Sequence, residues 1–93
     1  MNAKYTIKER IEYVGTRHSK RRHYAVYREN DDKCIAWDCP KAMAQKFILA
    51  STGMLNANAV LVSLRKKASN GADILASIAA DSLAKELVLL INK

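Results

Sequence analysis

Glycine and proline are scarce in this sequence, with three glycines and one proline among 93 residues. Low-complexity segments and disordered linkers are rich in these two residues, so the chain has little room for either. The longest uninterrupted apolar run, Leu87 to Ile91, has five residues, whereas a membrane-spanning helix needs about 20. The N-terminal residues include no apolar stretch like that of a secretion signal. We therefore expect a cytoplasmic protein without a membrane segment.

Motifs for catalysis and metal binding are also missing. The sequence has no glycine-rich phosphate loop and no nucleophile elbow, so we expect neither an enzyme nor a cofactor. Cys34 and Cys39 lie in a segment typical of a strand, where five residues extend up to about 17 Å. A disulfide needs Cα atoms within about 7 Å, and zinc knuckles place their paired ligands within a turn. We expect reduced thiols and no metal site with His18 or His23.

Charge is unevenly distributed along the chain. The net charge is +7, and residues 1–53 hold 11 lysines and arginines against 6 acids. Residues 13–28 contain five of these cations and no acid. A length of 93 residues indicates one domain, which we divide into a β part, residues 1–38, and a helical part, residues 40–93. A cluster of cations of this kind attracts phosphates or acidic protein surfaces.

The first 38 residues predict a three-stranded antiparallel meander. Residues 5–13 alternate between apolar and polar side chains, as in a half-buried strand, although Thr6 and Glu9 also fit a helix capping box. Residues 22–29 and 33–37 predict the second and third strands, and Asn30, Asp31 and Asp32 between them are typical of a tight turn. The connection after the first strand is longer and basic.

The rest of the chain predicts two or three helices packed on one face of that sheet, an α+β fold. Pro40 suits a helix start, and Gly53 suits a left-handed helix end. Asn56 is typical of a second helix cap, although Val60 to Val62 could instead be a strand. A long final helix is expected from about Asp73 to Ile91.

The expected strand directions define two faces. We predict that one face points toward the helices with Ile7, Ile11, Tyr13, Tyr24, Val26, Ile35 and Trp37. The other face would then carry Lys8, Arg10, Glu12, His23, Ala25, Tyr27, Cys34 and Ala36. Cations beside an aromatic ring suit nucleic acid, because they displace counterions from phosphates and the ring stacks on a base. The alternative is a solvated hairpin that only keeps the protein soluble.

Residues 44–64 resemble the DNA-binding helix-turn-helix motif. The resemblance rests on Gly53 in the turn and on apolar residues at Ile48, Met54 and Val62. Leu49 and Thr52 depart from it, since the motif prefers a small and an apolar residue there. The motif implies base contacts by Asn56 and Asn58 and phosphate contacts by Arg65, Lys66 and Lys67. The alternative is an ordinary helical hairpin that packs Phe47, Ile48, Leu61 and Leu64 into the core.

The last helix is apolar almost all round near its end, which indicates burial on several sides. Either the other helices of this chain enclose it, or another chain does. We predict a partner or homodimer interface at Leu83, Leu87, Leu90 and Ile91.

These patterns predict a small nucleic-acid-binding regulatory or accessory module, and they leave DNA and RNA both open. The predicted contacts are Lys8, Arg10, Arg17, Lys20, Arg21, Arg22 and Tyr27. The alternative is a protein-interaction module, an inhibitor or adaptor that docks on a larger partner.

Overall fold

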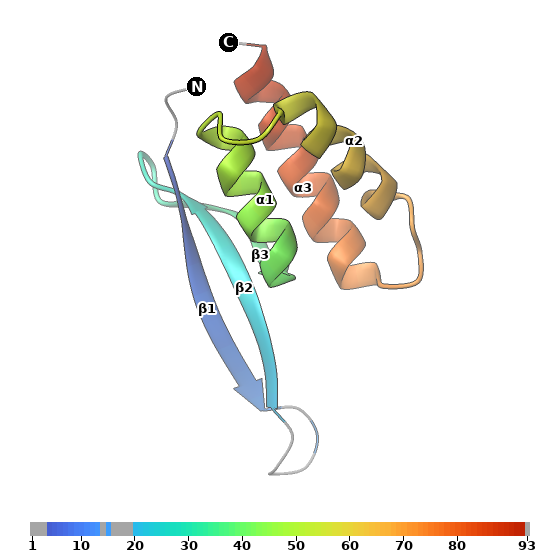
Figure 1. Ribbon diagram of the computed structural model, residues 1–93. Coiled ribbons are helices and arrows are strands. Elements are labelled where there is room, and N and C mark those ends of the chain that lie inside the picture. Colours follow the sequence, from blue (N-terminus) through green and yellow to red (C-terminus); the bar gives the residue numbers. More distant parts are fainter. Residues whose placement is uncertain (1–3, 14, 16–19, 93) are drawn as a thin grey trace.

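Three strands followed by three helices make up the fold of the computed structural model, which describes residues 4–13, 15 and 20–92 (Figure 1). The elements are β1 Tyr5–Tyr13, β2 Lys20–Arg28, β3 Lys33–Cys39, α1 Lys41–Ser51, α2 Ala57–Ala68 and α3 Ile74–Ile91. The strands form one antiparallel sheet in the order β1-β2-β3. The predicted α+β arrangement is confirmed, and Val60 to Val62 lie within α2.

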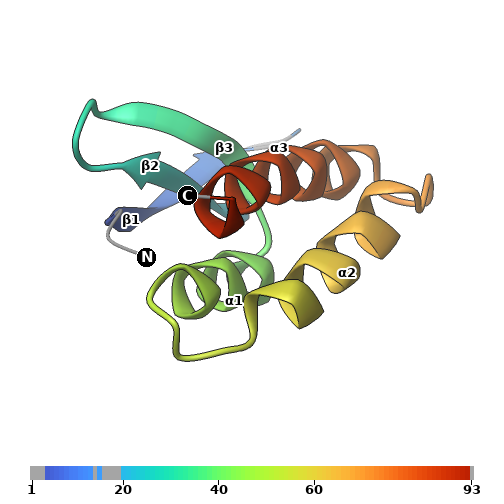
Figure 2. The same cartoon turned by 90° about the horizontal axis from the view of Figure 1, so that it is seen from above.

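All three helices lie on one side of the sheet (Figure 2). Helices α1 and α3 pack on the strands, and α2 packs mainly on α3. We call the opposite side of the sheet the helix-free face. Among the described helices, none combines the length and the apolar character needed to cross a bilayer.

The element boundaries follow the expected chemistry. Asp32 adopts φ 55° in the turn between β2 and β3, and Gly53 adopts φ 83° after α1. Asn56 and Asp73 cap α2 and α3. Each side chain accepts a hydrogen bond from the backbone N–H group three residues later in the chain. Pro40 precedes the first residue of α1.

The core lies between the sheet and the helices. Its largest fully buried apolar side chains are Phe47, Leu83, Leu87 and Val26, and burying each contributes about 1.5–3 kcal/mol. The Tyr5 ring meets Phe47 edge-on, with ring centroids 4.9 Å apart. Phe47, Leu61 and Leu64 are buried and Ile48 packs against them, as in an ordinary helical hairpin.

The structure corrects the predicted interface at the end of the last helix. Leu83, Leu87 and Leu90 are buried in the core of the single chain, and Ile91 packs against that core. Enclosure by the other helices therefore explains the apolar character of this segment, and no partner can reach these leucines in the folded chain. Homodimerisation itself stays a prediction.

Two features of the sheet differ from the straight alternation assumed for the sequence. Val26 pairs with Ala36 and Tyr27 pairs with Cys34, so β3 has one extra residue between these pairs. Such a β-bulge reverses the faces of the residues that follow it, here as far as a second register shift before Cys39, which pairs with Tyr24. Ala36 is therefore buried in the core and Trp37 is 54% exposed, the reverse of the prediction.

The second feature is a hairpin arm. The last pair between β2 and β3 is Tyr24 with Cys39, so residues 10–13 and 20–23 form a two-stranded ribbon, which projects past the helices in Figure 1. Ile11 and Tyr13 lie on the predicted side of this ribbon but are 51% and 69% exposed, because the helices do not reach that far.

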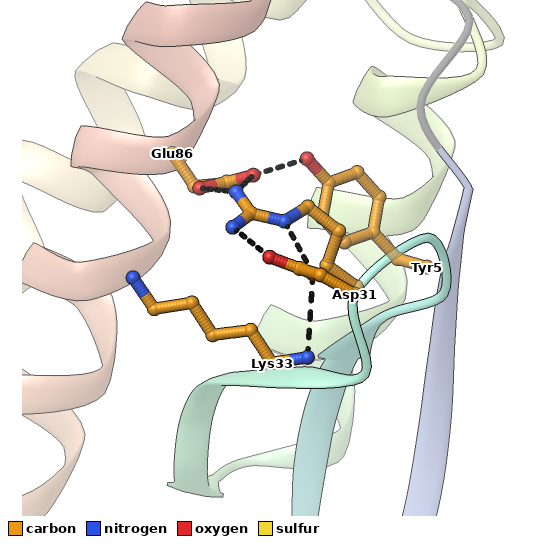
Figure 3. A network of polar contacts seen from close by, with 5 residues as sticks. Tyr5, Asp31, Lys33 and Glu86 are labelled. Atoms are coloured by element: carbon orange, nitrogen blue, oxygen red, sulfur yellow. Dashed lines mark hydrogen bonds and ion pairs between the residues drawn. The ribbon is translucent and has the colours of Figure 1, made fainter.

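A polar network joins the sheet to the middle of α3 (Figure 3). Glu86 is buried and accepts hydrogen bonds from the Tyr5 hydroxyl and, at 3.0 Å, from Arg28 Nη1. Arg28 also donates to Asp31 at 2.7 and 2.9 Å. One cation of the acid-free stretch is thus a structural residue. The same network holds the pKa of Asp31 down, at about 2, chiefly through the hydrogen bonds from Arg28.

Candidate nucleic-acid interface

The helix-free face is defined by the register of β1 and β2. Lys8 pairs with Ala25, Arg10 with His23 and Thr6 with Tyr27. Directly opposed residues of an antiparallel pair point to the same face, so these side chains gather there, as expected from the sequence. Ala25 and His23 are nevertheless buried, and His23 Nε2 lies 3.4 Å from a carboxylate oxygen of Glu12.

Two cations converge on one aromatic ring at this face. The Lys8 Nζ lies 4.5 Å from the centroid of the Tyr27 ring, and Arg10 Nη2 donates a hydrogen bond to the Tyr27 hydroxyl at 2.9 Å. Within the described residues, no carboxylate lies within 4.0 Å of either cation. The ring orders both side chains without neutralising them, so both charges are free to pair with an anion.

Trp37 lies on the edge strand β3 between His23 and α3, where it borders a small cavity with Leu75 and Ile78, although the sequence placed it in the core. Its ring meets the His23 ring edge-on, with centroids 6.1 Å apart, and half of the residue is exposed. Residues 33–37 include no glycine or other residue typical of a bulge, so the sequence carries no signal for the outward placement of Trp37. Beneath these side chains, the Nδ1 atom of His23 is buried without a hydrogen-bond partner among the described residues.

Arg21 has a different role from the one predicted. Its guanidinium donates two hydrogen bonds of 2.6 Å to the Asp38 carboxylate, and Asp38 is only 6% exposed. These hydrogen bonds hold the pKa of Asp38 below its usual range. Glu12 lies 3.9 Å from the same guanidinium. Because both Arg21 terminal nitrogens are engaged, Arg21 fastens β2 to β3 and is not a free phosphate contact.

Two other predicted cations, Lys20 and Arg22, lie at the hairpin arm. Arg22 pairs with Glu9 at 2.8 Å, on the side of the ribbon opposite Lys8 and Arg10. Lys20 Nζ lies 5.9 Å from the Tyr13 ring on that same side. Arg17 lies outside the described residues. The structure therefore brings Lys8, Arg10 and Tyr27 together and separates Lys20 and Arg22 from them.

The two cysteines have contrasting environments. Cys34 is exposed and pairs with Tyr27 across the helix-free face, whereas Cys39 is buried, and both thiols are free. Burial, helped by the neighbouring Asp38 carboxylate, raises the pKa of the Cys39 thiol to about 12. No group of three histidine, cysteine, aspartate or glutamate side chains suited to a metal ion occurs in the part of the chain that the structure describes.

The two asparagines that the helix-turn-helix resemblance assigned to base contacts, Asn56 and Asn58, lie at the start of α2. Asn56 Oδ1 accepts the hydrogen bond from the Ala59 N–H, so its amide oxygen is engaged in capping. Asn58 is exposed on α2.

Comparison of the chain with models of known protein families, with curated proteins and with solved structures finds no match in any of the three.

Proposed function

We propose that this protein is a small regulatory or accessory module that binds nucleic acid on the helix-free face of its sheet. Lys8 and Arg10 are the primary phosphate contacts in this proposal. Lys20 lies on the opposite side of the ribbon and is no part of this face, and Arg17 stays a contact predicted from the sequence alone. The observation that carries it is the pair of cations ordered on Tyr27, neither of which has a carboxylate within 4.0 Å among the described residues. Cations of this kind release condensed counterions when they meet phosphates, which is the main source of affinity for nucleic acid.

The dimensions of the hairpin arm support this proposal. Two paired strands lie about 4.8 Å apart, and the major groove of B-DNA, about 12 Å wide, admits a two-stranded ribbon. The arm extends beyond the helices, so the helical layer does not block its approach to a duplex.

Single-stranded nucleic acid would use the same face differently. The Tyr27 ring already has Lys8 over it, so a base that stacks there has to displace the ammonium group. Trp37 is the more open platform because half of it is exposed. Stacking contributes about 1–3 kcal/mol per base. We therefore expect Trp37→Ser to weaken binding to a single strand and to leave duplex binding unchanged.

The test compares two neutralising double variants in fluorescence anisotropy with labelled duplex DNA, single-stranded DNA and RNA. Lys8→Gln/Arg10→Gln removes the proposed contacts. Lys41→Gln/Lys66→Gln removes the same charge from exposed helical positions on the other side of the molecule. The proposal predicts a large loss of affinity only for the first variant. Equal losses would mean that net charge alone attracts the nucleic acid, or that it binds through the helix-turn-helix residues that include Lys66.

The cytoplasm is the compartment we propose, because nucleic acid is present there and both thiols of this chain stay reduced there. The alternative function, docking on a partner protein, has its support on a different surface, between α1 and α2.

A further inference from the structure

Helices α1 and α2 lie in the longest acid-free part of the chain. Residues 39–72 contain five lysines and arginines and no aspartate or glutamate. The five cations are Lys41, Lys46, Arg65, Lys66 and Lys67. Within the described residues, none of them has a carboxylate within 4.0 Å. This side of the molecule therefore carries five cations that form no ion pair with another described residue.

A groove between α1 and α2 opens within this basic surface. It has a volume of about 180 Å³, and its lining includes Met43, Val60 and Leu64 together with Lys46 from α1 and Lys67 from α2. The three apolar residues are nearly buried and form the floor, whereas both lysines are exposed and stand at the rim. We call this feature the α1–α2 groove. It combines an apolar floor with a cation on each wall.

The size and the lining of the α1–α2 groove restrict the ligand. Sites for drug-sized molecules measure about 300–1,000 Å³, so a volume of about 180 Å³ suits one bulky apolar side chain. Protein interfaces commonly depend on such an anchor residue in a pocket. The lysines on the two walls favour an anchor that has carboxylates beside it. Opposite charges on the two proteins speed their association, and partners with positive charges there are repelled.

We propose that the α1–α2 groove binds an acidic segment of a partner protein, which inserts one leucine-like or phenylalanine-like side chain between the helices. This binding does not depend on the proposed nucleic-acid function, because the groove belongs to the helical layer and the helix-free face lies on the other side of the sheet (Figure 2). A phosphate backbone would pair with the lysines but has no group that requires the apolar floor.

The probe for this proposal is a short fluorescein-labelled peptide with leucines at helical spacing and glutamates elsewhere. Two matched peptides carry glutamine in place of glutamate, or serine in place of leucine. Ser63→Phe fills the groove from an exposed position on its lining, and Lys46→Gln/Lys67→Gln neutralises its walls. Lys41→Gln/Lys66→Gln removes the same charge from positions outside the lining. Thermal melts verify that each variant is folded.

We expect the glutamate–leucine peptide to bind the wild type, and both groove variants to weaken it at least about tenfold, the effect typical of losing an anchor contact. The control variant should change affinity by less than about twofold. Three outcomes would overturn the proposal: no binding of this peptide, equal binding of the serine peptide, or full affinity in the Ser63→Phe variant. A labelled single-stranded oligonucleotide is tested in parallel. If it binds more tightly than the peptide, and if only Lys46→Gln/Lys67→Gln abolishes that binding, the surface belongs to nucleic acid instead.

Discussion

Arg21 and Asp38 form a two-pronged ion pair, with both nitrogen–oxygen distances at 2.6 Å. Arg21 belongs to the acid-free residues 13–28, and Asp38 is buried near the end of β3. One of the five cations in this segment therefore has a structural role, because it joins β2 to β3. In the function we propose, phosphate binding is assigned to Lys8 and Arg10, which have no carboxylate within 4.0 Å among the described residues.

Arg21→Gln should destabilise the fold, because it leaves the Asp38 carboxylate buried without its cation. We expect the melting temperature, measured by circular dichroism, to fall by roughly 5 °C or more. Arg21→Met/Asp38→Leu should recover much of this loss, since it removes both charges together. A single variant as stable as the wild type would contradict the structural role of Arg21.

Acid should destabilise the protein through Asp31 and Asp38. The pKa of each is lowered in the folded chain by arginine hydrogen bonds, that of Asp31 to about 2, while an unfolded aspartate has a pKa of about 3.9. The resulting stabilisation is complete above about pH 4 and is lost as the pH falls toward 2. Thermal melts across this range should show a smaller decline for Asp38→Asn than for the wild type. Asp81→Asn is the control, because Asp81 forms only an exposed pair with Lys85.

The residues of the network around Glu86 should contribute unequally to the free energy of unfolding. Tyr5→Phe removes one hydrogen bond to Glu86 and should cost about 0.5–1.5 kcal/mol. Glu86→Ala removes the acceptor of Tyr5 and Arg28 together and should cost more than Tyr5→Phe, although Arg28 keeps its ion pair with Asp31. Urea unfolding measures both values. Equal effects of the two substitutions would show that the Arg28 contact contributes little.

Thiol reactivity should distinguish the two cysteines. Maleimide should label Cys34 in the native protein and spare Cys39, because Cys39 is buried and its pKa of about 12 keeps the thiol protonated. In urea, both should react. Since Cys34 lies beside Tyr27, bound nucleic acid should slow its labelling, as followed by mass spectrometry. Rapid labelling of Cys34 in the saturated complex would place the nucleic acid elsewhere.

Local signals in the sequence were enough to predict the order of elements and part of the candidate surface. The turn at Asp32, the cap at Asn56, the start of the last helix near Asp73, and the shared face of Lys8, Arg10 and Tyr27 follow from residue types and alternation. Each depends only on neighbours in the chain or on a single strand register.

Features that depend on distant contacts escaped prediction. The bulge in β3 turns Trp37 outward, and the carboxylate that engages Arg21 comes from another strand. The leucines of α3 were assigned to an interface because a sequence does not show which segments enclose an apolar helix. The α1–α2 groove was missed for the same reason, since its walls come from two helices.

The salt dependence of duplex binding tests the central claim most directly. Anisotropy titrations over a range of salt concentrations give the slope of log affinity against log salt for the wild type, Lys8→Gln/Arg10→Gln and Lys41→Gln/Lys66→Gln. If Lys8 and Arg10 each neutralise one phosphate, their loss should reduce the slope by about 1.8, at roughly 0.9 per contact. The control variant should keep the wild-type slope. An unchanged slope after loss of Lys8 and Arg10 would contradict phosphate binding at the helix-free face.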